Sequence, residues 1–313
     1  PELFSVAQAH IWKSKCVDQT GLIWLGARYY NPNGGRFLSP DPVSHPVCLD
    51  LYAYANGDPI NNFDLNGLFS SPVYGTVPAT NINSSSSLPT VTFNEAFEET
   101  YAPNNRSRRY DLGRPELPNG LRISYHNGIG NEFEDSRKSA IHISDLAGGH
   151  NVHVIYGATM GFIRDVDSYN RARNHEDTGR VRLLHEDWNE HLDKYPDGYI
   201  LQYSHSRGSM DVCNALLCYP EHRRQRIFNA AIAPGGYIYS ETCAKVTHYR
   251  VPRLRDFIPY KDSEGAKREK NTIVKLESHE DAPWHDHTIM SPTYINSIKN
   301  EYEIFIQTKG NIK

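Results

Sequence analysis

Apolar and polar positions recur with two different periods along this chain, and the change of period separates predicted strands from predicted helices. From residue 114 onward, short apolar runs are typical of buried strands, at 121–125, 152–156, 199–203, 227–233, 246–249 and 273–276. Longer stretches with an apolar residue every three or four positions predict helices over 133–146, 181–195, directly after 206 and over 294–306. Strands that alternate with helices of this length indicate a mostly parallel sheet with helices on both faces.

The first 68 residues follow another pattern, in which short aromatic-rich pieces are separated by turn residues. Ile23-Trp24, Tyr29-Tyr30 and Phe37-Leu38 have the composition of strands, and Asn31–Gly35 has that of a turn. Residues 69–112 are rich in Pro, Ser, Asn and Thr, a composition that buries little apolar surface. We therefore expect a small β-rich segment over 1–68, a flexible linker over 69–112 and an α/β domain over 113–313.

One serine stands where a strand turns sharply into a helix. Ser206 follows the apolar run 199–203 within the motif Ser204-His205-Ser206-Arg207-Gly208, and an apolar pattern with helical spacing begins at Met210. A strand, a tight turn and a helix with a serine at the apex form a nucleophile elbow, which lifts the hydroxyl clear of the sheet. Small residues at 204 and 208 suit such a turn. A chance S-x-S-x-G in a serine-rich chain is the alternative, and the strand and helix around it favour the elbow.

Partners for a nucleophilic serine follow further along the chain in the order Ser, Asp, His. Asp256 follows the predicted strand 246–249, and His287 comes just before the last predicted helix. A neutral imidazole at His287 could take the proton of Ser206 and be held in one tautomer by Asp256. The competing residues are Asp262 and Asp281 for the acid, and His279 and His285 for the base. The histidine-rich loop could instead be plain surface, or a weak metal site at 285–287, although adjacent loop residues rarely close a metal shell.

Backbone amides for a developing oxyanion are expected from two loops. The N–H of Arg207 follows the nucleophile, and the loop after strand 121–125 offers the N–H of Gly128 or Ile129. Ordinary turn chemistry is the alternative for the glycines of this loop. The dinucleotide-binding pattern G-x-G-x-x-G is not completed, because Phe133 occupies the third glycine position.

Composition narrows the function classes. The 33 basic and 37 acidic residues give a net charge of −4, so nucleic-acid binding is not expected. The five cysteines form no C-x-x-C pair, which argues against a zinc ribbon and favours free thiols. No apolar run approaches the roughly 20 residues of a membrane-spanning helix. The chain begins at Pro1, and we expect it to be a piece of a longer protein, with any targeting signal upstream.

The N-terminal segment resembles the Rhs-repeat-associated core domain, through Leu25–Pro32, Gly35–Pro42 and Leu51–Tyr54. This resemblance covers about the first 68 residues. It implies a large β-cage, formed with upstream sequence, that encloses a C-terminal toxin. It also implies self-cleavage after Leu68 by the aspartates at Asp41 and Asp64, since two carboxylates with separated pKa values can activate water or an amide.

Two departures from the family motifs bear on that self-cleavage. Ser44-His45 stands where the family has Gly-Trp, and Leu65 stands where it has a second Pro. The alternative interpretation is that both aspartates simply cap turns.

Residues from about 115 to the end resemble an α/β-hydrolase, and more narrowly an uncharacterised chlamydial protein family with that fold. The residues that carry this resemblance are 127–131, 204–208, 231–237, 255–259 and 286–287. It implies a serine hydrolase acting on an ester or lipid by acyl transfer, without a cofactor. Together the two resemblances predict a secreted or delivered effector, with an immunity protein as a further partner. A catalytically silent hydrolase fold used for binding and a nuclease-type toxin are the rival hypotheses.

Overall fold

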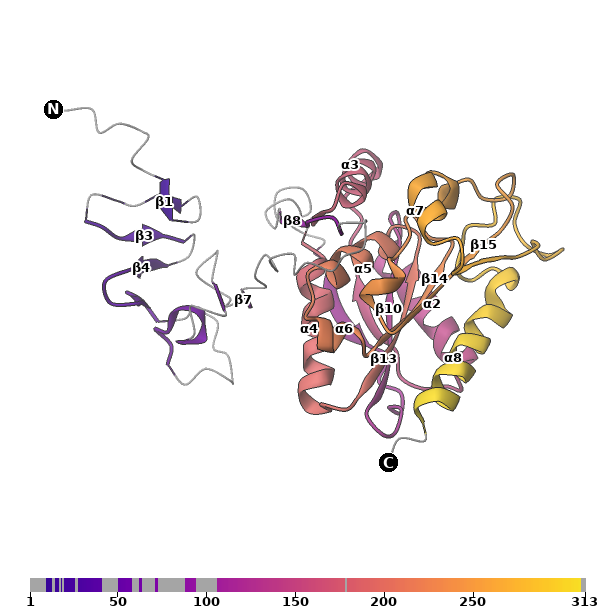
Figure 1. Cartoon of the computed structure of the whole chain (residues 1–313), viewed down its shortest axis with the longest axis horizontal. Helices are drawn as coiled ribbons and strands as arrows, with labels where there is room; N and C mark the ends of the chain where they lie inside the picture. The colour runs from indigo at the N-terminus through magenta and orange to yellow at the C-terminus, as the bar shows by residue number, and fades with distance from the viewer. Residues whose placement is uncertain are drawn as a thin grey trace, which may run out of the picture. The chain divides into compact units, whose positions relative to one another are not determined.

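The structure is a computed structural model, and it describes residues 10–12, 15–16, 18, 20–25, 28–40, 50–57, 62–63, 71–72, 88–93, 106–177 and 179–310. The chain divides into two compact units, residues 1–83 and 84–313 (Figure 1). The residues expected to take part in self-cleavage, Asp41, Asp64 and Leu68, lie outside the described residues, so self-cleavage stays a prediction.

The first unit contains small antiparallel sheets, as the sequence pattern predicts. Three strands form the sheet β3-β4-β5; they are β3 (Ile23–Trp24), β4 (Tyr29–Asn31) and β5 (Arg36–Phe37). Two strand pairs accompany it; they are β1 (His10–Trp12) with β2 (Lys15–Cys16) and β6 (Asn62–Phe63) with β7 (Ser71–Pro72). A short 3-10 helix, η2, spans Tyr54–Gly57. In the described part of this unit, one apolar cluster is formed by Ile23, Leu25, Tyr30, Phe37, Tyr54 and Ala55.

The second unit is built on a seven-stranded sheet in the order β16-β15-β14-β13-β10-β11-β9. The central strands are β10 (Leu121–His126), β11 (His153–Tyr156), β13 (Tyr199–His205) and β14 (Ile227–Ile232). The outer strands are β15 (Lys245–Arg250), β16 (Ile273–Lys275) and β9 (Arg108–Asp111). All neighbours pair in parallel except β9, which runs antiparallel to β11.

The strand order reverses between β10 and β13. The chain passes from β10 outward to β11, then returns to the other side of β10 at β13 and proceeds to β14, β15 and β16. Connections on opposite faces open a crevice outside the carboxyl ends of the two strands at such a reversal, which is where ligands bind in open α/β sheets. Ser206 follows β13 and Asn127 follows β10, so the predicted elbow and glycine loop lie at this point.

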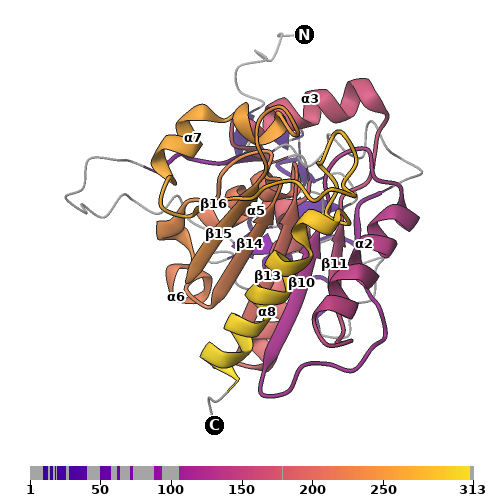
Figure 2. The ribbon, with the colours of Figure 1, turned by 90° about the vertical axis from the view of Figure 1, so that its right-hand side faces the viewer.

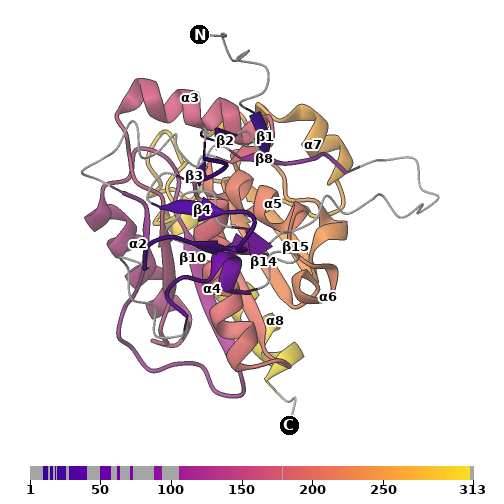
Figure 3. The same ribbon diagram turned by 90° about the vertical axis from the view of Figure 1, so that its left-hand side faces the viewer.

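Helices cover both faces of the sheet, as predicted. One face carries α2 (Phe133–Leu146) and α8 (Ile295–Lys309), which cross in front of the strands in Figure 2. The other face carries α4 (Val181–Lys194) and α5 (Gly208–Leu217), seen from the opposite side in Figure 3. Three further helices lie nearer the ends of the strands: α3 (Phe162–Arg173), α6 (Glu221–Arg224) and α7 (Ser263–Arg268). The unit therefore has an α/β-hydrolase fold with a mostly parallel sheet between two helical layers.

The two faces of strand β10 differ sharply, although every residue of the strand is buried. Leu121, Ile123 and Tyr125 belong to the apolar core that includes α2 and α8. Arg122 and Ser124 alternate with them and bind the carboxylate of Asp187 in α4, at 2.9 and 2.7 Å. The polar face of the strand is thus satisfied by buried hydrogen bonds instead of by water.

The structure contains elements that the sequence pattern did not predict, among them α3, α7 and β12 (Glu176–Asp177). Helix α3 was not predicted, because its apolar positions are sparse among charged and polar ones. The range expected to be a linker, 69–112, contains edge strand β9, and it also contains β8 (Thr92–Phe93), which pairs with β12. Both strands are short and polar at several positions, so composition alone does not separate them from a linker.

Among the described residues, no helix is both long enough and apolar enough to cross a bilayer. In the same part of the chain Cys213, Cys218 and Cys243 are free thiols.

Candidate active site

The backbone of Ser206 adopts the left-handed conformation expected of a nucleophile elbow. Its φ is +53°, a region that costs a non-glycine residue about 1–3 kcal/mol. Hydrogen bonds hold this turn in place: the Ser206 N–H donates to the carbonyl of Ile232 at 3.3 Å. The Ser206 carbonyl in turn accepts from the N–H of Gly235 and from the hydroxyl of Ser209, both at 2.7 Å. Contacts from β14 and α5 therefore fix the strained turn between β13 and α5.

Two glycines allow the surrounding backbone to approach the elbow closely. A Cβ atom on Gly208 would lie 2.6 Å from the carbonyl oxygen of His126 and 2.7 Å from that of Asn127. A Cβ atom on Gly128 would lie 2.7 Å from the Cβ atom of Ser206. Side chains do not tolerate such distances, so the first turn of α5 packs on the end of β10 only because 208 is glycine. Gly128 likewise allows the backbone of the loop after β10 to lie against Ser206.

The three residues predicted to act together meet in one hydrogen-bonded line. The Nε2 atom of His287 lies 2.8 Å from the Oγ atom of Ser206, and its Nδ1 atom lies 2.7 Å from Oδ2 of Asp256. Asp256 is fully buried, and its other oxygen accepts from the N–H of Ile258 at 3.0 Å. A carboxylate only accepts, so His287 donates from Nδ1 and presents the Nε2 lone pair to the serine hydroxyl. This arrangement allows His287 to take the proton of Ser206.

The competing residues do not occupy this line. Asp262 caps the start of α7 through its side chain. Asp281 lies 3.6 Å from His279, and both side chains are exposed. His285 comes nearest, with Nε2 3.8 Å from Oδ1 of Asp256. The histidine that contacts the Ser206 hydroxyl is His287. Asp256 and His287 are therefore the partners of the serine in this structure.

The glycine loop after β10 is locked by two asparagine side chains. The Asn127 amide donates to the carbonyls of Gly128 at 2.7 Å and Gly157 at 2.9 Å, and Asn131 donates to the carbonyl of Ile129 at 3.1 Å. With these carbonyls held, the peptide planes of the loop keep a fixed direction beside the nucleophile. Arg207 stands at the N-terminal end of α5, where helical backbone N–H groups point outward. The predicted oxyanion donors thus come from two fixed backbone segments that flank the serine.

A buried ionic cluster lies next to the elbow, at the start of α5. The Asp211 carboxylate lies 3.2 Å from the Arg207 guanidinium, 3.5 Å from that of Arg180 and 3.0 Å from Nε2 of His126. Burial raises the pKa of Asp211, but Arg207, the His126 hydrogen bond and Arg180 outweigh it and hold that pKa well below its usual range. The side chain of Arg207 is therefore buried and ion-paired in the interior of the protein, and it does not point toward a substrate.

His205, directly before the nucleophile, contacts the catalytic histidine candidate and was missed by the sequence analysis. Its Nε2 donates to the backbone carbonyl of His287, and the two rings lie 5.1 Å apart. Burial, with a smaller effect of the neighbouring His287, lowers the pKa of His205 to about 3, so the ring is neutral and donates through Nε2 alone. The contact joins residues 82 positions apart, which no local sequence pattern reveals.

We expect His205→Ala to lower kcat by about 10- to 100-fold, because His287 loses the donor that holds its backbone and small misplacements of a reacting group are costly. His205→Gln keeps an Nε2–H group and should recover part of that loss. Steady-state hydrolysis of a soluble ester measures both variants, with thermal unfolding as the control for folding. A wild-type kcat in folded His205→Ala would show that the contact does not position His287.

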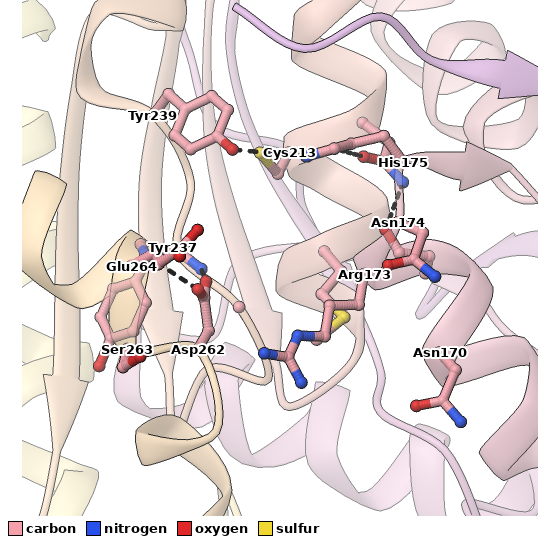
Figure 4. Close-up of a pocket in the computed structure, with 15 residues that line it drawn as sticks. Asn170, Arg173, Asn174, His175, Cys213, Tyr237, Tyr239, Asp262, Ser263 and Glu264 are labelled. Atoms are coloured by element: carbon pink, nitrogen blue, oxygen red, sulfur yellow. Dashed lines mark hydrogen bonds between the residues drawn. The ribbon is translucent and has the colours of Figure 1, made fainter.

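A pocket of about 490 Å³ adjoins the elbow between α3, α5, the loop after β14 and the start of α7 (Figure 4). Met210 and Gly236 belong to its wall, and the Ser209 hydroxyl, which binds the Ser206 carbonyl, lies 2.9 Å from the carbonyl of Gly236. The polar lining residues are Asn170, Arg173, Asn174, His175, Asn214, Tyr237, Tyr239, Asp262, Ser263 and Glu264. Such a lining suits a polar group better than an alkyl chain.

The described residues hold no group of three His, Cys, Asp or Glu side chains placed to bind a metal ion. In the loop considered for a weak metal site, Asp286 is buried and accepts from the hydroxyl of Thr293 at 2.7 Å, while His287 is bonded to Asp256.

Comparison with known proteins gives short sequence similarities and a distant structural one. No protein-family model matches the chain. It is 50% identical over 54 residues to the tRNA nuclease WapA of Bacillus subtilis (strain 168); the matched stretch covers 16% of this chain and 2% of that protein. It is 39% identical over 57 residues to the toxin subunit YenC2 of Yersinia entomophaga; this stretch covers 18% of this chain and 6% of that protein. The chain thus spans only a few per cent of the length of these curated relatives.

Among solved structures, the chain is similar to an α/β serine hydrolase without lid from Xanthomonas campestris. The TM-score is 0.37 and the sequence identity is 11%, and the match covers 65% of this chain and 94% of the other.

Proposed function

We propose that the second unit is a serine hydrolase that cleaves carboxylic esters by acyl transfer. The observation that carries the proposal is the continuous hydrogen-bonded line from Asp256 through His287 to Ser206, with the serine at a strained elbow. A base within hydrogen-bond reach of a nucleophile, itself oriented by a third group, is the arrangement that activates a serine hydroxyl.

The reaction proceeds in two halves. The Ser206 oxygen attacks the ester carbonyl while His287 Nε2 takes its proton, and Asp256 stabilises the imidazolium through Nδ1–H. The N–H groups of Arg207 and of Gly128 or Ile129 donate to the oxyanion. The tetrahedral intermediate then collapses, His287 protonates the leaving alcohol, and an acyl-serine remains. A water molecule, deprotonated by His287, attacks the acyl group and releases the acid and the free serine.

The proposal extends to the biological setting of this hydrolase. The Rhs-like motifs of the first unit, together with the short similarity to the toxin subunit YenC2, support an effector or toxin domain carried by an Rhs-type protein. In that setting an upstream β-cage would enclose the hydrolase, and an immunity protein would protect the producing cell.

Covalent labelling tests the hydrolase proposal directly. A fluorophosphonate probe should modify the full chain at one serine, and mass spectrometry should place the adduct on Ser206. The Ser206→Ala variant should remain unlabelled, whereas the matched control Ser204→Ala, two residues earlier in the same motif, should be labelled like the wild type. Folded wild-type protein that takes up no probe would contradict the proposal and favour a catalytically silent fold. Metal-dependent cleavage of nucleic acid in its place would favour the nuclease hypothesis.

A further inference from the structure

The pocket beside the elbow has a buried floor and an exposed polar rim. Its floor includes Met210, Cys213, Asn214 and Tyr237, which are all buried. Its rim is formed by the exposed residues Asn170, Arg173, Asn174, Ser263 and Glu264. The volume of about 490 Å³ lies within the range of roughly 300–1,000 Å³ that small-molecule sites occupy. The pocket is therefore large enough for a small organic ligand.

One wall of the pocket is a chain of three polar side chains. The Asn214 amide oxygen lies 2.8 Å from Nδ1 of His175, and Nε2 of His175 lies 3.4 Å from the Tyr239 hydroxyl. The backbone of His175 has a φ of +58°, a strained conformation that persists only where surrounding contacts fix it. These side chains are therefore ordered before any ligand arrives, which reduces the entropic cost of binding.

The facing wall, on the other side of the pocket in Figure 4, carries the carboxylate of Asp262. Each of its oxygens accepts one hydrogen bond, from the N–H of Gly265 at 2.9 Å and from that of Tyr237 at 3.1 Å. A carboxylate has about four acceptor sites, so this one can accept further donors from a ligand. Glu264 adds a second carboxylate at the rim. This wall is therefore an acceptor surface.

The rim offers hydrogen-bonding groups that the fold does not use. The side-chain amides of Asn170 and Asn174 have no hydrogen-bond partner among the described residues. Arg173 donates one N–H to the carbonyl of Lys261 at 2.9 Å, and a guanidinium has five N–H groups. Its side chain extends into the space between the two walls in Figure 4. A ligand in the pocket can therefore bind both amides and the remaining N–H groups of Arg173.

This set of groups favours a neutral ligand rich in hydroxyl groups. The carboxylates of Asp262 and Glu264 repel an anion such as phosphate, and the Arg173 guanidinium repels a cation. A hydroxyl donates one hydrogen bond and accepts up to two, so neighbouring hydroxyls can satisfy amides, carboxylates and guanidinium together. Ala172 and Met210 offer apolar surface to the C–H groups between those hydroxyls. An alkyl chain would instead leave the polar groups without partners.

The loop after β14 joins this pocket to the nucleophile. A Cβ atom on Gly235 would lie 3.0 Å from the carbonyl oxygen of Ser206, and one on Gly236 would lie 2.9 Å from Cγ of Met210 in the pocket floor. Consecutive Cα atoms are about 3.8 Å apart, so the serine backbone and the pocket wall are separated by about one residue of chain. A group bound in the pocket therefore lies next to the elbow.

We propose that this pocket binds the hydroxyl-rich part of the ester substrate, a sugar or a comparable polyol, and that the enzyme cleaves esters of such molecules. The substrate part of this inference rests on the proposed function, because it requires the serine hydrolase, whereas binding of the polyol does not. The chemistry that the pocket recognises is a set of neighbouring hydroxyls, which either the alcohol or the acid half of an ester can carry.

Binding of free sugars tests the pocket without any need for catalysis. Saturation-transfer NMR on the full chain should detect methyl glycosides, with glycine as a zwitterionic probe and inorganic phosphate as an anionic one. Asn170→Ala and Asn174→Ala should each raise the Kd of the glycoside about five- to tenfold, since each removes hydrogen bonds to the ligand. The matched control Asn296→Ala removes an exposed asparagine from α8, on the other face of the sheet, and should bind like the wild type.

Glu264→Gln separates a neutral ligand from a charged one, because it removes the charge and keeps an acceptor oxygen. It should change the Kd of the glycoside by less than about threefold. Thermal unfolding of each variant controls for folding. Binding of glycine or phosphate without binding of any glycoside would overturn the assignment of a polyol. Glycoside binding that both asparagine variants leave unchanged would place the sugar elsewhere and overturn the pocket.

Hydrolysis separates the pocket from the proposed function. An acetate ester of a methyl glycoside is compared with hexyl acetate, and methyl gluconate with methyl hexanoate, so that the hydroxyls lie on the alcohol side in one pair and on the acid side in the other. In one pair kcat/KM should favour the hydroxyl-rich ester about tenfold, and Asn174→Ala should reduce that preference. Glycoside binding without hydrolysis of any ester would leave the pocket standing and overturn the hydrolase. Equal hydrolysis within both pairs would overturn the substrate class alone.

Discussion

Ser206→Ala is expected to lower kcat for a soluble ester by about 10⁶, and the double variant Ser206→Ala/His287→Ala is expected to lower it no further. The reason is that the nucleophile and the base act as one unit, joined in this structure by the 2.8 Å contact between Oγ and Nε2. Once the nucleophile is gone, the base has no proton to take. Steady-state kinetics on a short-chain p-nitrophenyl ester measures both variants.

Two observations control this comparison. Ser204→Ala should retain kcat close to that of the wild type, because the Ser204 hydroxyl is buried and makes no recorded contact with the reacting groups. Circular dichroism should show that all variants are folded. Losses that multiply in the double variant would mean that Ser206 and His287 act independently, which the proposed mechanism does not allow.

Asp256→Asn is expected to lower kcat by about 10⁴ with little change in KM. An asparagine fits the same buried space, but its amide can turn an N–H group toward His287 and favour the tautomer that carries its proton on Nε2. That tautomer has no lone pair for the hydroxyl of Ser206. The loss therefore arises from a wrong tautomer and not from an altered fold.

The same kinetic measurement checks Asp256→Asn against Asp281→Asn, which changes an exposed aspartate in the neighbouring loop. Asp281→Asn should leave kcat near the wild-type value. An Asp256→Asn variant that keeps more than about one tenth of the wild-type kcat would remove Asp256 from the proposed machinery. A pH-rate profile of the residual activity would then be needed to find another acid.

Ser206, Asp256 and His287 all lie in segments that follow strands of the sheet. This placement explains why the sequence could indicate the site at all. In a parallel sheet the carboxyl ends of the strands lie at one edge, so residues just after several strands are brought together regardless of their separation along the chain. Ser206 follows β13 directly, and Asp256 and His287 lie in the longer loops after β15 and β16; the strand pattern was regular enough to locate all three strands.

The support behind the site was not accessible from the sequence. His205 binds a carbonyl 82 residues away, and Asp211 gathers Arg207, Arg180 and His126 from three separate elements. In the sequence these are polar residues near strands and helices, with nothing to show that they are buried. Only the packing of α4 and α5 on the sheet decides that their charges face one another and not water.

By itself the sequence determined the strand and helix alternation, the parallel sheet and the chain order of serine, acid and base, because these follow from local periodicity and from the geometry of a strand end. Tertiary structure decided which acid and which histidine reach the serine, since the competing residues Asp262, Asp281, His279 and His285 also follow the last strands and differ in where their loops fold. It also decided that β9 joins the sheet from within a polar stretch, because an edge strand needs a neighbour to pair with more than it needs an apolar pattern of its own.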